Sequence, residues 1–373
     1  MKSFPHKNQH RNPLKFSRKS TLAAATAVGG LVLAFLPLSA SAAGPQAAAA
    51  DTRASAAAAG LMTMYDSDTA LFDGNGWWTS ANAVTSLIDH MRVSGDSGYE
   101  SVVSEIHDRN IDAQGGNFTN EYLDDTGWWG LAWVDAYDQT GDTKYLDTAR
   151  ADADHMAEYW NDQCGGGVQW NETKAYKNAI TNELYLQLTA ALHNRIDGDT
   201  QYLDRAKAEW NWFSGSGMIN GSKMINDGLG DDCANNGQTA WTYNQGVVLG
   251  GLTELARATG DNGYLDTARE LADASTTSGD ITADGVLREP GEGECSGDGA
   301  SFKGAYVRGL GALNSRLDDH PYTGWLDRNA DAAYANDRTD QDIYGSHWNG
   351  PLTSSNHSCQ HSALDLLNAA TQK

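Results

Sequence analysis

Two adjacent carboxylates, Asp124 and Asp125, stand just before an apolar run in the stretch NEYLDDTGWWGLAWV. A pair of carboxyl groups can cleave a glycosidic bond, because one protonates the leaving oxygen while the other acts as nucleophile or activates water. Adjacent residues have Cα atoms about 3.8 Å apart, and a carboxyl separation of roughly 5 Å suits the retaining, double-displacement mechanism. The pair is therefore a candidate catalytic site, and its closeness favours retention over inversion.

An aspartate pair is also an ordinary way to begin a helix, since Asp is a good N-cap and suits the helix N-terminus electrostatically. The chain has two further pairs, Asp231-Asp232 and Asp318-Asp319, so a doublet alone decides little. Only Asp124-Asp125 precedes a helix predicted to open into a cleft, with the helix expected to start at Asp125 or Thr126. The two acids are expected to split their pKa values, the ionised one favoured by the helix N-terminus and the protonated one by like-charge repulsion and aromatic burial.

A phrase beginning with Gly-Asp recurs along the chain and indicates a helical repeat. Copies start at Gly95, Gly141, Gly198 and Gly260, and a degenerate copy starts at Asp318. Each copy combines a short turn with an aromatic residue and Leu at the start of an amphipathic helix. Because each copy also follows an apolar helix, the pattern predicts helical hairpins.

The helices before these turns are rich in Gly, Ala and Leu, and those after them are charged, which predicts a buried inner set and an exposed outer set. An (α/α)6 barrel of six inner and six outer helices, an all-α fold in a single domain over residues 51–373, accounts for the pattern. A helical solenoid is the alternative, but solenoid repeats keep a fixed period, and here the copies lie 46, 57 and 62 residues apart. The predicted inner helices cover residues 80–93, 127–140, 182–196, 244–259 and 302–317, with a leading helix at 51–65 and a closing helix at about 357–370.

The long segments that lead into the inner helices are rich in glycine and aromatic residues, and long loops at one end of a scaffold usually build its site. Aromatic faces stack on sugar rings while amides and carboxylates bond sugar hydroxyls, so the composition favours a carbohydrate cleft. One member of each Trp-Trp pair is expected to pack in the core with Trp133, because helix neighbours point in different directions. The candidate substrate-binding residues are Trp77, Trp78, Tyr122, Trp128, Trp129, Asn182, Tyr243, Asn244, Gln245, Phe302 and Lys303.

The first 42 residues have the pattern of a secretory signal peptide: a basic start, an apolar stretch at 20–38 and a small-residue cleavage site ending at Ala42. An uncleaved membrane anchor is the less favoured alternative, and an Ala-rich leader (43–50) follows. Cleavage removes six basic residues and no acids, which moves the formal charge from −23 to −29. Such acidity disfavours nucleic acids, anionic lipids and polyanionic polysaccharides as partners. We expect a secreted, extracellular monomer with no membrane contact after cleavage.

Four cysteines, Cys164, Cys233, Cys295 and Cys359, allow two disulfides in three connectivities. The chain has no C-x-x-C pair, Walker loop, G-x-S-x-G elbow or H-E-x-x-H motif. His357 and His361 stand four apart and could share a metal, but a capping and a packing histidine are the preferred interpretation. No metal or cofactor is expected.

Six stretches follow one another over about residues 60–370: GWWTSAN, YLDDTGWWGLAWVDAY, CGGGVQW, KNAITNELY, YNQGVVLGGL and FKGAYVR. In these the chain resembles glycoside hydrolase family 76, which contains bacterial endo-α-1,6-mannanases and related fungal cell-wall transglycosidases. The resemblance implies an (α/α)6 barrel without a cofactor that cleaves α-1,6-mannan or manno-oligosaccharides with retention. It also implies that Asp124 is the nucleophile and Asp125 the acid/base. Transglycosylation and non-catalytic mannan binding on the same scaffold are the alternatives.

Overall fold

The computed structural model describes residues 45–73 and 76–372, and twelve α-helices lie within these ranges. The predicted signal peptide (1–42) and the first two residues of the predicted leader lie outside the described residues. The rest of that leader is helical, because the first helix begins at Pro45 and not at residue 51 as predicted. In the part of the chain described, no helix is both long and apolar enough to cross a membrane.

Six helices form a closed inner ring. Each helix contacts the next one in the ring, and the last contacts the first. Their side chains are buried along most of their length, as the low content of Lys and Glu predicted. Ring closure confirms the (α/α)6 barrel and excludes a solenoid. The inner helices are α2 (Trp77–Ser94), α4 (Leu123–Thr140), α6 (Ala179–His193), α8 (Thr242–Thr259), α10 (Gly299–Arg316) and α12 (His357–Thr371).

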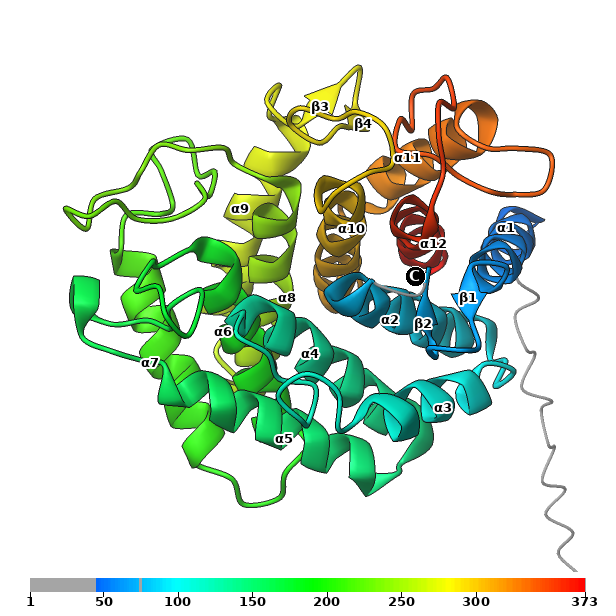
Figure 1. The fold of residues 1–373 in the computed structure, drawn as a ribbon. Helices are drawn as coiled ribbons and strands as arrows, with labels where there is room; N and C mark the ends of the chain where they lie inside the picture. The colour runs from blue at the N-terminus through cyan, green and yellow to red at the C-terminus, as the bar shows by residue number, and fades with distance from the viewer. Residues whose placement is uncertain (1–44, 74–75, 373) are drawn as a thin grey trace, which may run out of the picture. The chain divides into compact units, whose positions relative to one another are not determined.

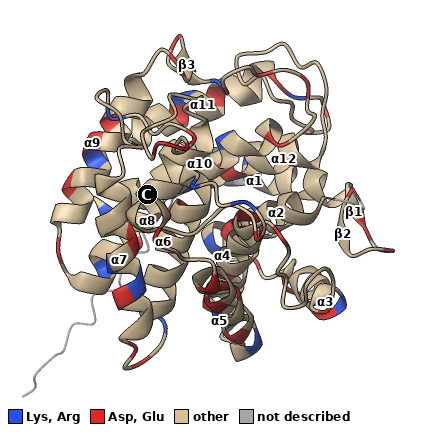
Figure 2. Cartoon of the chain, turned by 60° about the vertical axis from the view of Figure 1, so that its left-hand side comes forward, with Lys and Arg blue, Asp and Glu red and all other residues tan. Residues whose placement is uncertain are grey.

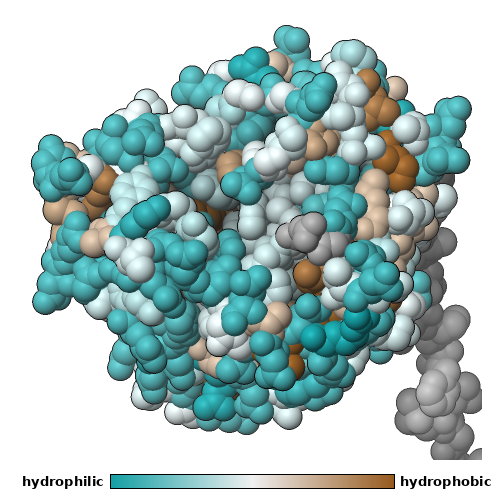
Figure 3. Space-filling model, viewed as in Figure 1, coloured by the Kyte–Doolittle hydropathy of each residue, from teal (hydrophilic) through white to brown (hydrophobic). Residues whose placement is uncertain are grey.

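The remaining helices surround the inner ring in chain order (Figure 1). They bury one stripe of apolar side chains and carry many of the charged residues, as Figure 2 shows for α5 and α7. The face of the protein in Figure 3 is correspondingly mainly hydrophilic, with only small apolar patches. The outer helices are α1 (Pro45–Met62), α3 (Glu100–Asn110), α5 (Thr143–Glu158), α7 (Gln201–Gly215), α9 (Gly263–Thr277) and α11 (Thr323–Asn336).

Strands are confined to two short antiparallel ribbons in the described residues. In the first, β1 (Tyr65–Asp66) pairs with β2 (Leu71–Phe72), with Tyr65 opposite Phe72. In the second, β3 (Thr282–Ala283) pairs with β4 (Val286–Leu287). Both ribbons lie in segments that lead from an outer helix into an inner one.

The recurring Gly-Asp phrase is a helix stop followed by a helix start. The helices α2, α4 and α8 end at Gly95, Gly141 and Gly260, whose φ angles are 72°, 70° and 72°. This left-handed conformation strains any residue with a Cβ, which explains the glycine. In the second copy, the Asp142 side chain then accepts a hydrogen bond of 3.0 Å from the backbone N–H of Lys144 and caps α5. The turns at this end of the barrel can therefore be short.

Two disulfides join the long segments at the opposite end. Cys164 is bonded to Cys233, which links the segment before α6 to the segment before α8. Cys295 is bonded to Cys359, which links the segment before α10 to the first turn of α12. Of the three connectivities that the sequence allowed, this one fastens the loops to one another across neighbouring inner helices.

The helices α8 and α10 approach backbone to backbone at Gly246 and Gly309. A Cβ added at Gly309 would overlap the carbonyl oxygen of Gly246, and one added at Gly246 would overlap the Cα of Tyr306. No flexible side chain is available to move aside at either contact. The closeness of these two inner helices therefore depends on both glycines.

We predict that Gly309→Ala lowers the free energy of unfolding by about 1–3 kcal/mol, or more if the two helices cannot separate, because the overlap is with backbone. The matched control is Gly324→Ala, at an exposed helical position where an added Cβ meets nothing within 4 Å. It should change stability by about 0.5 kcal/mol or less. Thermal and denaturant unfolding measure both variants, and equal stability of the two would contradict the close approach.

Candidate active site

The aspartate pair lies in the first turn of α4, which begins at Leu123 after the extended residue Tyr122. The prediction that the helix starts at Asp125 or Thr126 is therefore wrong. Its N-terminus is set instead by a neighbouring loop, because the backbone N–H of Leu123 donates to the carbonyl of Trp170 over 2.9 Å. Tyr122, the N-cap residue, makes no side-chain capping bond. Neither carboxylate is needed to cap the helix, and both are free for chemistry.

Neutral donors hold both carboxylates. Asp124 accepts a hydrogen bond of 3.1 Å from the indole N–H of Trp170 and one of 3.2 Å from the backbone N–H of Asp125. Asp125 accepts a bond of 2.7 Å from the side-chain amide of Asn120. Asn120 is itself oriented by the backbone N–H of Tyr122, which donates to its amide oxygen over 2.8 Å. Each acid therefore has a fixed position, and the ion pairs found among the described residues include neither of them.

The surroundings of the pair raise both pKa values. Burial raises the pKa of Asp125 to about 7, with the charge of Asp298 adding to the effect and the Asn120 hydrogen bond opposing it. Burial, followed by the charge of Asp125, raises the pKa of Asp124 well above its ordinary value, while the Trp170 bond and two backbone N–H groups oppose the rise. Near neutral pH such a pair can hold one proton and one negative charge, which an acid and a nucleophile require.

Aromatic rings enclose the pair in a pocket of about 310 Å³. The rings of Trp78 and Trp128 are stacked 5.9 Å apart, and those of Tyr243 and Phe302 are stacked 3.8 Å apart. Flat apolar walls beside carboxylates suit a pyranose ring, which has apolar faces and equatorial hydroxyls. The pocket is lined by Trp78, Tyr122, Asp124, Asp125, Trp128, Trp170, Tyr243, Asp298 and Phe302.

The two Trp-Trp pairs each divide between pocket and core, as the sequence predicted. Trp78 and Trp128 line the pocket. Trp129 is completely buried and stacks on Trp133 at 5.3 Å, while Trp77 stacks on Phe118 at 5.7 Å. The predicted substrate contacts of Trp77 and Trp129 are therefore not supported, because their rings pack against other core rings.

The predicted amide contacts fall outside the pocket wall as well. Asn182 is buried, and it accepts a bond of 2.7 Å from the backbone N–H of Val168. Gln245 is buried and exchanges bonds of 2.9 and 2.8 Å with the backbone of Ile225. These amides fasten long loops to the inner helices because they replace the missing backbone partners of irregular segments. Asn244 is also fully buried and lies outside the pocket wall.

Lys303 lies behind the pocket wall. Its ammonium group donates to Glu292 and to the carbonyl of Ser346, and it lies 4.3 Å from the centre of the Trp348 ring. It therefore lines a neighbouring pocket and has its charge matched by Glu292. Of the eleven predicted binding residues, Trp78, Tyr122, Trp128, Tyr243 and Phe302 line the catalytic pocket.

Sequence reasoning missed Trp170 and Asp298 as pocket residues. Trp170 ends the stretch CGGGVQW, which lies in a loop and not at the start of an inner helix. Asp298 immediately precedes α10 and accepts a bond of 3.1 Å from the indole N–H of Trp78. An acid at the start of an inner helix was the signal that identified Asp124, and the same signal could have identified Asp298.

The histidines His357 and His361 have separate roles. His357 bonds Asp73 at 2.6 Å and Thr79 at 2.8 Å. His361 is fully buried and bonds Ser301 at 3.0 Å. Both connect α12 to neighbouring segments, as packing histidines do, but the expected capping histidine is wrong because the side chain of Asn356 caps α12. Among the described residues, no group of three or more His, Cys, Asp or Glu side chains could hold a metal ion.

Two further pockets each share lining residues with the catalytic pocket. One, of about 450 Å³, shares Asp298 and Phe302 with it and is otherwise formed mainly by the segment 289–300. The other, of about 490 Å³, shares Tyr122 with it and includes His155. The catalytic pocket therefore has two neighbouring pockets, one across Asp298 and Phe302 and the other across Tyr122.

Comparison with known proteins gives consistent relatives. The profile described as "Glycosyl hydrolase family 76" matches residues 49–372. A mannan endo-1,6-alpha-mannosidase, DCW1 of Saccharomyces cerevisiae, is 29% identical over 283 residues, which cover 69% of this chain and 62% of that protein. This chain thus spans less than two thirds of that relative's length.

Solved structures include proteins that this chain matches over nearly their whole length. An inactive variant of the α-1,6-mannanase GH76A of Salegentibacter sp. HEL1_6, with two consecutive aspartates replaced by alanine, was solved with α-1,6-mannotetrose. It is 26% identical with a TM-score of 0.77, over 86% of this chain and 98% of that one. A variant with two asparagines at those positions, in complex with α-1,6-mannotriose, has a TM-score of 0.76 at 26% identity, over 86% of this chain and 99% of that one.

We predict that the Asp125 carboxyl titrates near pH 7, and that Asp298→Asn lowers this pKa because it removes a negative charge that disfavours ionisation. Carbon-13 NMR of the aspartate carboxyl groups measures both values. The control is Asp318→Asn, which removes an equal charge from an exposed turn. An Asp125 pKa near 4, or equal shifts in the two variants, would contradict the described environment.

Proposed function

The chain belongs to glycosyl hydrolase family 76, and from this premise we propose that it is a secreted, retaining hydrolase of internal α-1,6-mannosidic bonds in mannan. The observation that carries the proposal is the acidic pair of α4, which lies among aromatic rings in a pocket. The oligosaccharides bound to the Salegentibacter variants and the activity for which the yeast relative is named support the choice of linkage. The signal-peptide pattern of residues 1–42 supports secretion.

In the proposed mechanism Asp124 is the nucleophile. Two N–H groups donate to its carboxylate, from Trp170 and from the backbone of Asp125. Donors of this kind stabilise the ionised form, and the first turn of a helix adds a favourable field. Burial and the charge of Asp125 raise the pKa of Asp124, but its two N–H donors favour the carboxylate, and we assign the negative charge of the reactive pair to Asp124. It attacks the anomeric carbon and forms a covalent mannosyl-enzyme.

Asp125 supplies the proton. In the described residues one side-chain donor, Asn120, contacts its carboxyl group, and its raised pKa of about 7 leaves a large protonated fraction up to neutral pH. It protonates the glycosidic oxygen as the first bond breaks, and it then removes a proton from the water that releases the sugar. Its protonated form is lost as the pH rises through 7, so the rate of the first step should fall there.

The flanking pockets support cleavage within a chain. We infer that a polysaccharide extends from the central pocket into both neighbouring pockets, so that sugar residues lie on both sides of the acidic pair. The formal charge of −23 adds no penalty for an uncharged polymer. Cleavage between occupied pockets releases oligosaccharides and not single sugars from an end.

The acidic pair lowers the stability of the folded protein, and this favours hydrolysis over simple mannan binding. The folded pKa of Asp125, about 7, exceeds its ordinary value of 3.8, so ionisation is disfavoured in the folded chain. Stability is therefore lost as the pH rises from near 4 through 7. A protein that only bound mannan would have no use for this destabilising arrangement, whereas a catalyst requires it.

Replacement of either acid by asparagine should reduce the release of manno-oligosaccharides from linear α-1,6-mannan by about 10³-fold or more. Asp125→Asn should also raise the Tm at pH 8 but leave it unchanged at pH 4, where the native Asp125 is already neutral. Activity assays and thermal unfolding of the same samples separate the two effects. Near wild-type turnover in either variant would exclude the proposed roles.

Products of mannan digestion should be oligosaccharides of several lengths, and the newly formed reducing ends should initially have the α configuration. Early proton NMR spectra report the configuration, and chromatography reports the lengths. Release of mannose alone would contradict internal cleavage, and an initial β product would contradict retention. Products longer than a short starting oligosaccharide would instead indicate transglycosylation.

A further inference from the structure

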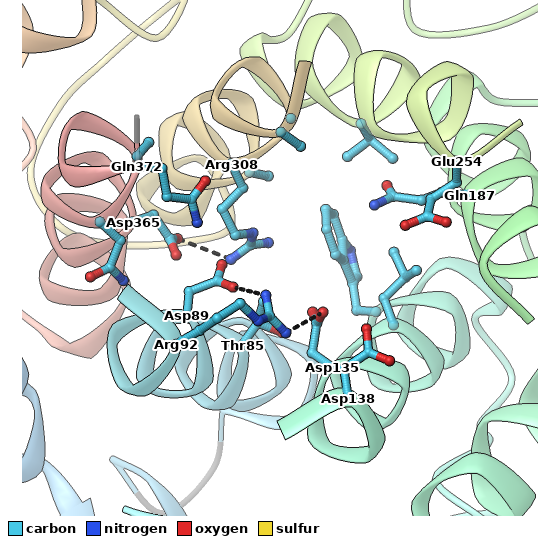
Figure 4. A pocket seen from close by; sticks show the side chains of 18 of the residues that line it. Thr85, Asp89, Arg92, Asp135, Asp138, Gln187, Glu254, Arg308, Asp365 and Gln372 are labelled. Atoms are coloured by element: carbon cyan, nitrogen blue, oxygen red, sulfur yellow. Dashed lines mark hydrogen bonds and ion pairs between the residues drawn. The ribbon is translucent and has the colours of Figure 1, made fainter. Parts of the chain in front are cut away.

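A further cavity, of about 340 Å³, lies inside the barrel towards the C-terminal ends of the inner helices and is called the charged cavity below. Its walls are charged, and the labelled side chains point towards one another across it (Figure 4). Arg92 pairs with Asp89 at 2.7 Å and with Asp135 at 3.2 Å. Arg195 pairs with Asp138 at 2.6 Å. The proposed chemistry uses none of these groups.

Trp128 lies in the wall of both this charged cavity and the catalytic pocket. On the catalytic side its ring stacks with Trp78, which lines only that pocket. Arg308 lines the charged cavity and not the catalytic pocket. Its guanidinium carbon lies 5.9 Å from the centre of the Trp128 ring. The indole therefore separates the two spaces, and each of its neighbours belongs to one of them.

Arg308, on α10, is held by side chains of two other inner helices. It donates to the carboxylate of Asp365 on α12 over 2.9 Å and to the side-chain oxygen of Asn82 on α2. Asp365 is completely buried, and it also accepts a bond of 2.5 Å from the hydroxyl of Ser86. The charge of Arg308 is thus matched by Asp365, and its guanidinium group cannot move without breaking these bonds.

We propose that Arg308 is a positioning residue that holds the indole of Trp128 in the catalytic pocket, so that sugar affinity depends on this one cation of the charged cavity. This inference rests on the proposed function. A cation near the ring is attracted to its π-face, and the cavity behind the ring offers space into which an unsupported indole could tilt. A tilted indole stacks less well on the sugar in the ground state and the transition state alike.

The test compares Arg308→Met with Arg195→Met in hydrolysis of α-1,6-mannotetraose. Arg308→Met should raise KM about tenfold and change kcat less than twofold, because uniform binding is lost. Arg195→Met breaks ion pairs with Asp138 and Glu254 in the same cavity, and the ring contact of Trp128 is with Arg308. It should leave both constants within twofold of wild type. Arg308→Lys, which keeps the charge, should raise KM about threefold and decides the question if the Met variant does not fold.

A measurement without substrate separates this inference from the proposed function. In protein labelled with 5-fluorotryptophan, the fluorine-19 signal of Trp128, assigned with Trp128→Phe, should shift or broaden in Arg308→Met but not in Arg195→Met. An unchanged KM in folded Arg308 variants, or an equal effect in Arg195→Met, overturns the positioning role. A wild-type protein that does not cleave the tetrasaccharide overturns the proposed function instead, and the fluorine signal then decides on Arg308 alone.

Discussion

The burial of two adjacent carboxyl groups without a cation is the constraint on which the site end of the barrel depends. Such groups are costly to ionise when buried. Since no cation offsets this cost, neutral hydrogen-bond donors have to be held in place beside them. Trp170 and Asn120 provide these contacts from loops, and the loop with Trp170 is fastened by the Cys164–Cys233 disulfide. The long segments that enter the inner helices therefore fix the carboxylates as well as forming the walls of the cleft.

Most of the architecture could be predicted from the sequence, because the repeat follows from local chemistry. Gly141 must end α4 in a left-handed conformation, and Asp142 must cap α5, so the phrase marks each hairpin directly. The start of α4 was misplaced because its N-terminus is set by a backbone bond between Leu123 and Trp170. A contact between residues 47 positions apart leaves no local signal.

The site was predicted unevenly for a related reason. Aromatic residues at helix starts can pack in the core or line the cleft. Neighbouring residues on a helix point in different directions, so Trp128 and Trp129 cannot both do the same. Buried amides such as Asn182 and Gln245 have a residue type that suits sugar hydroxyls, yet irregular loops need the same groups for their backbones. Composition cannot distinguish these uses, because the partner of each amide is known only once the loop is placed.

Closure of the inner ring by the packing of α12 against α2 also determines which part of the fold forms last. The Ser86–Asp365 bond joins residues 279 positions apart, and Asp365 belongs to the last helix of the chain. Loops of this length close late and slowly, because their ends must meet before any contact offsets the lost entropy. During synthesis the barrel therefore stays open until its final helix emerges. A chain that lacks α12 leaves α2 and α10 without the helix that joins them in the ring, so their apolar faces there stay uncovered until α12 is in place.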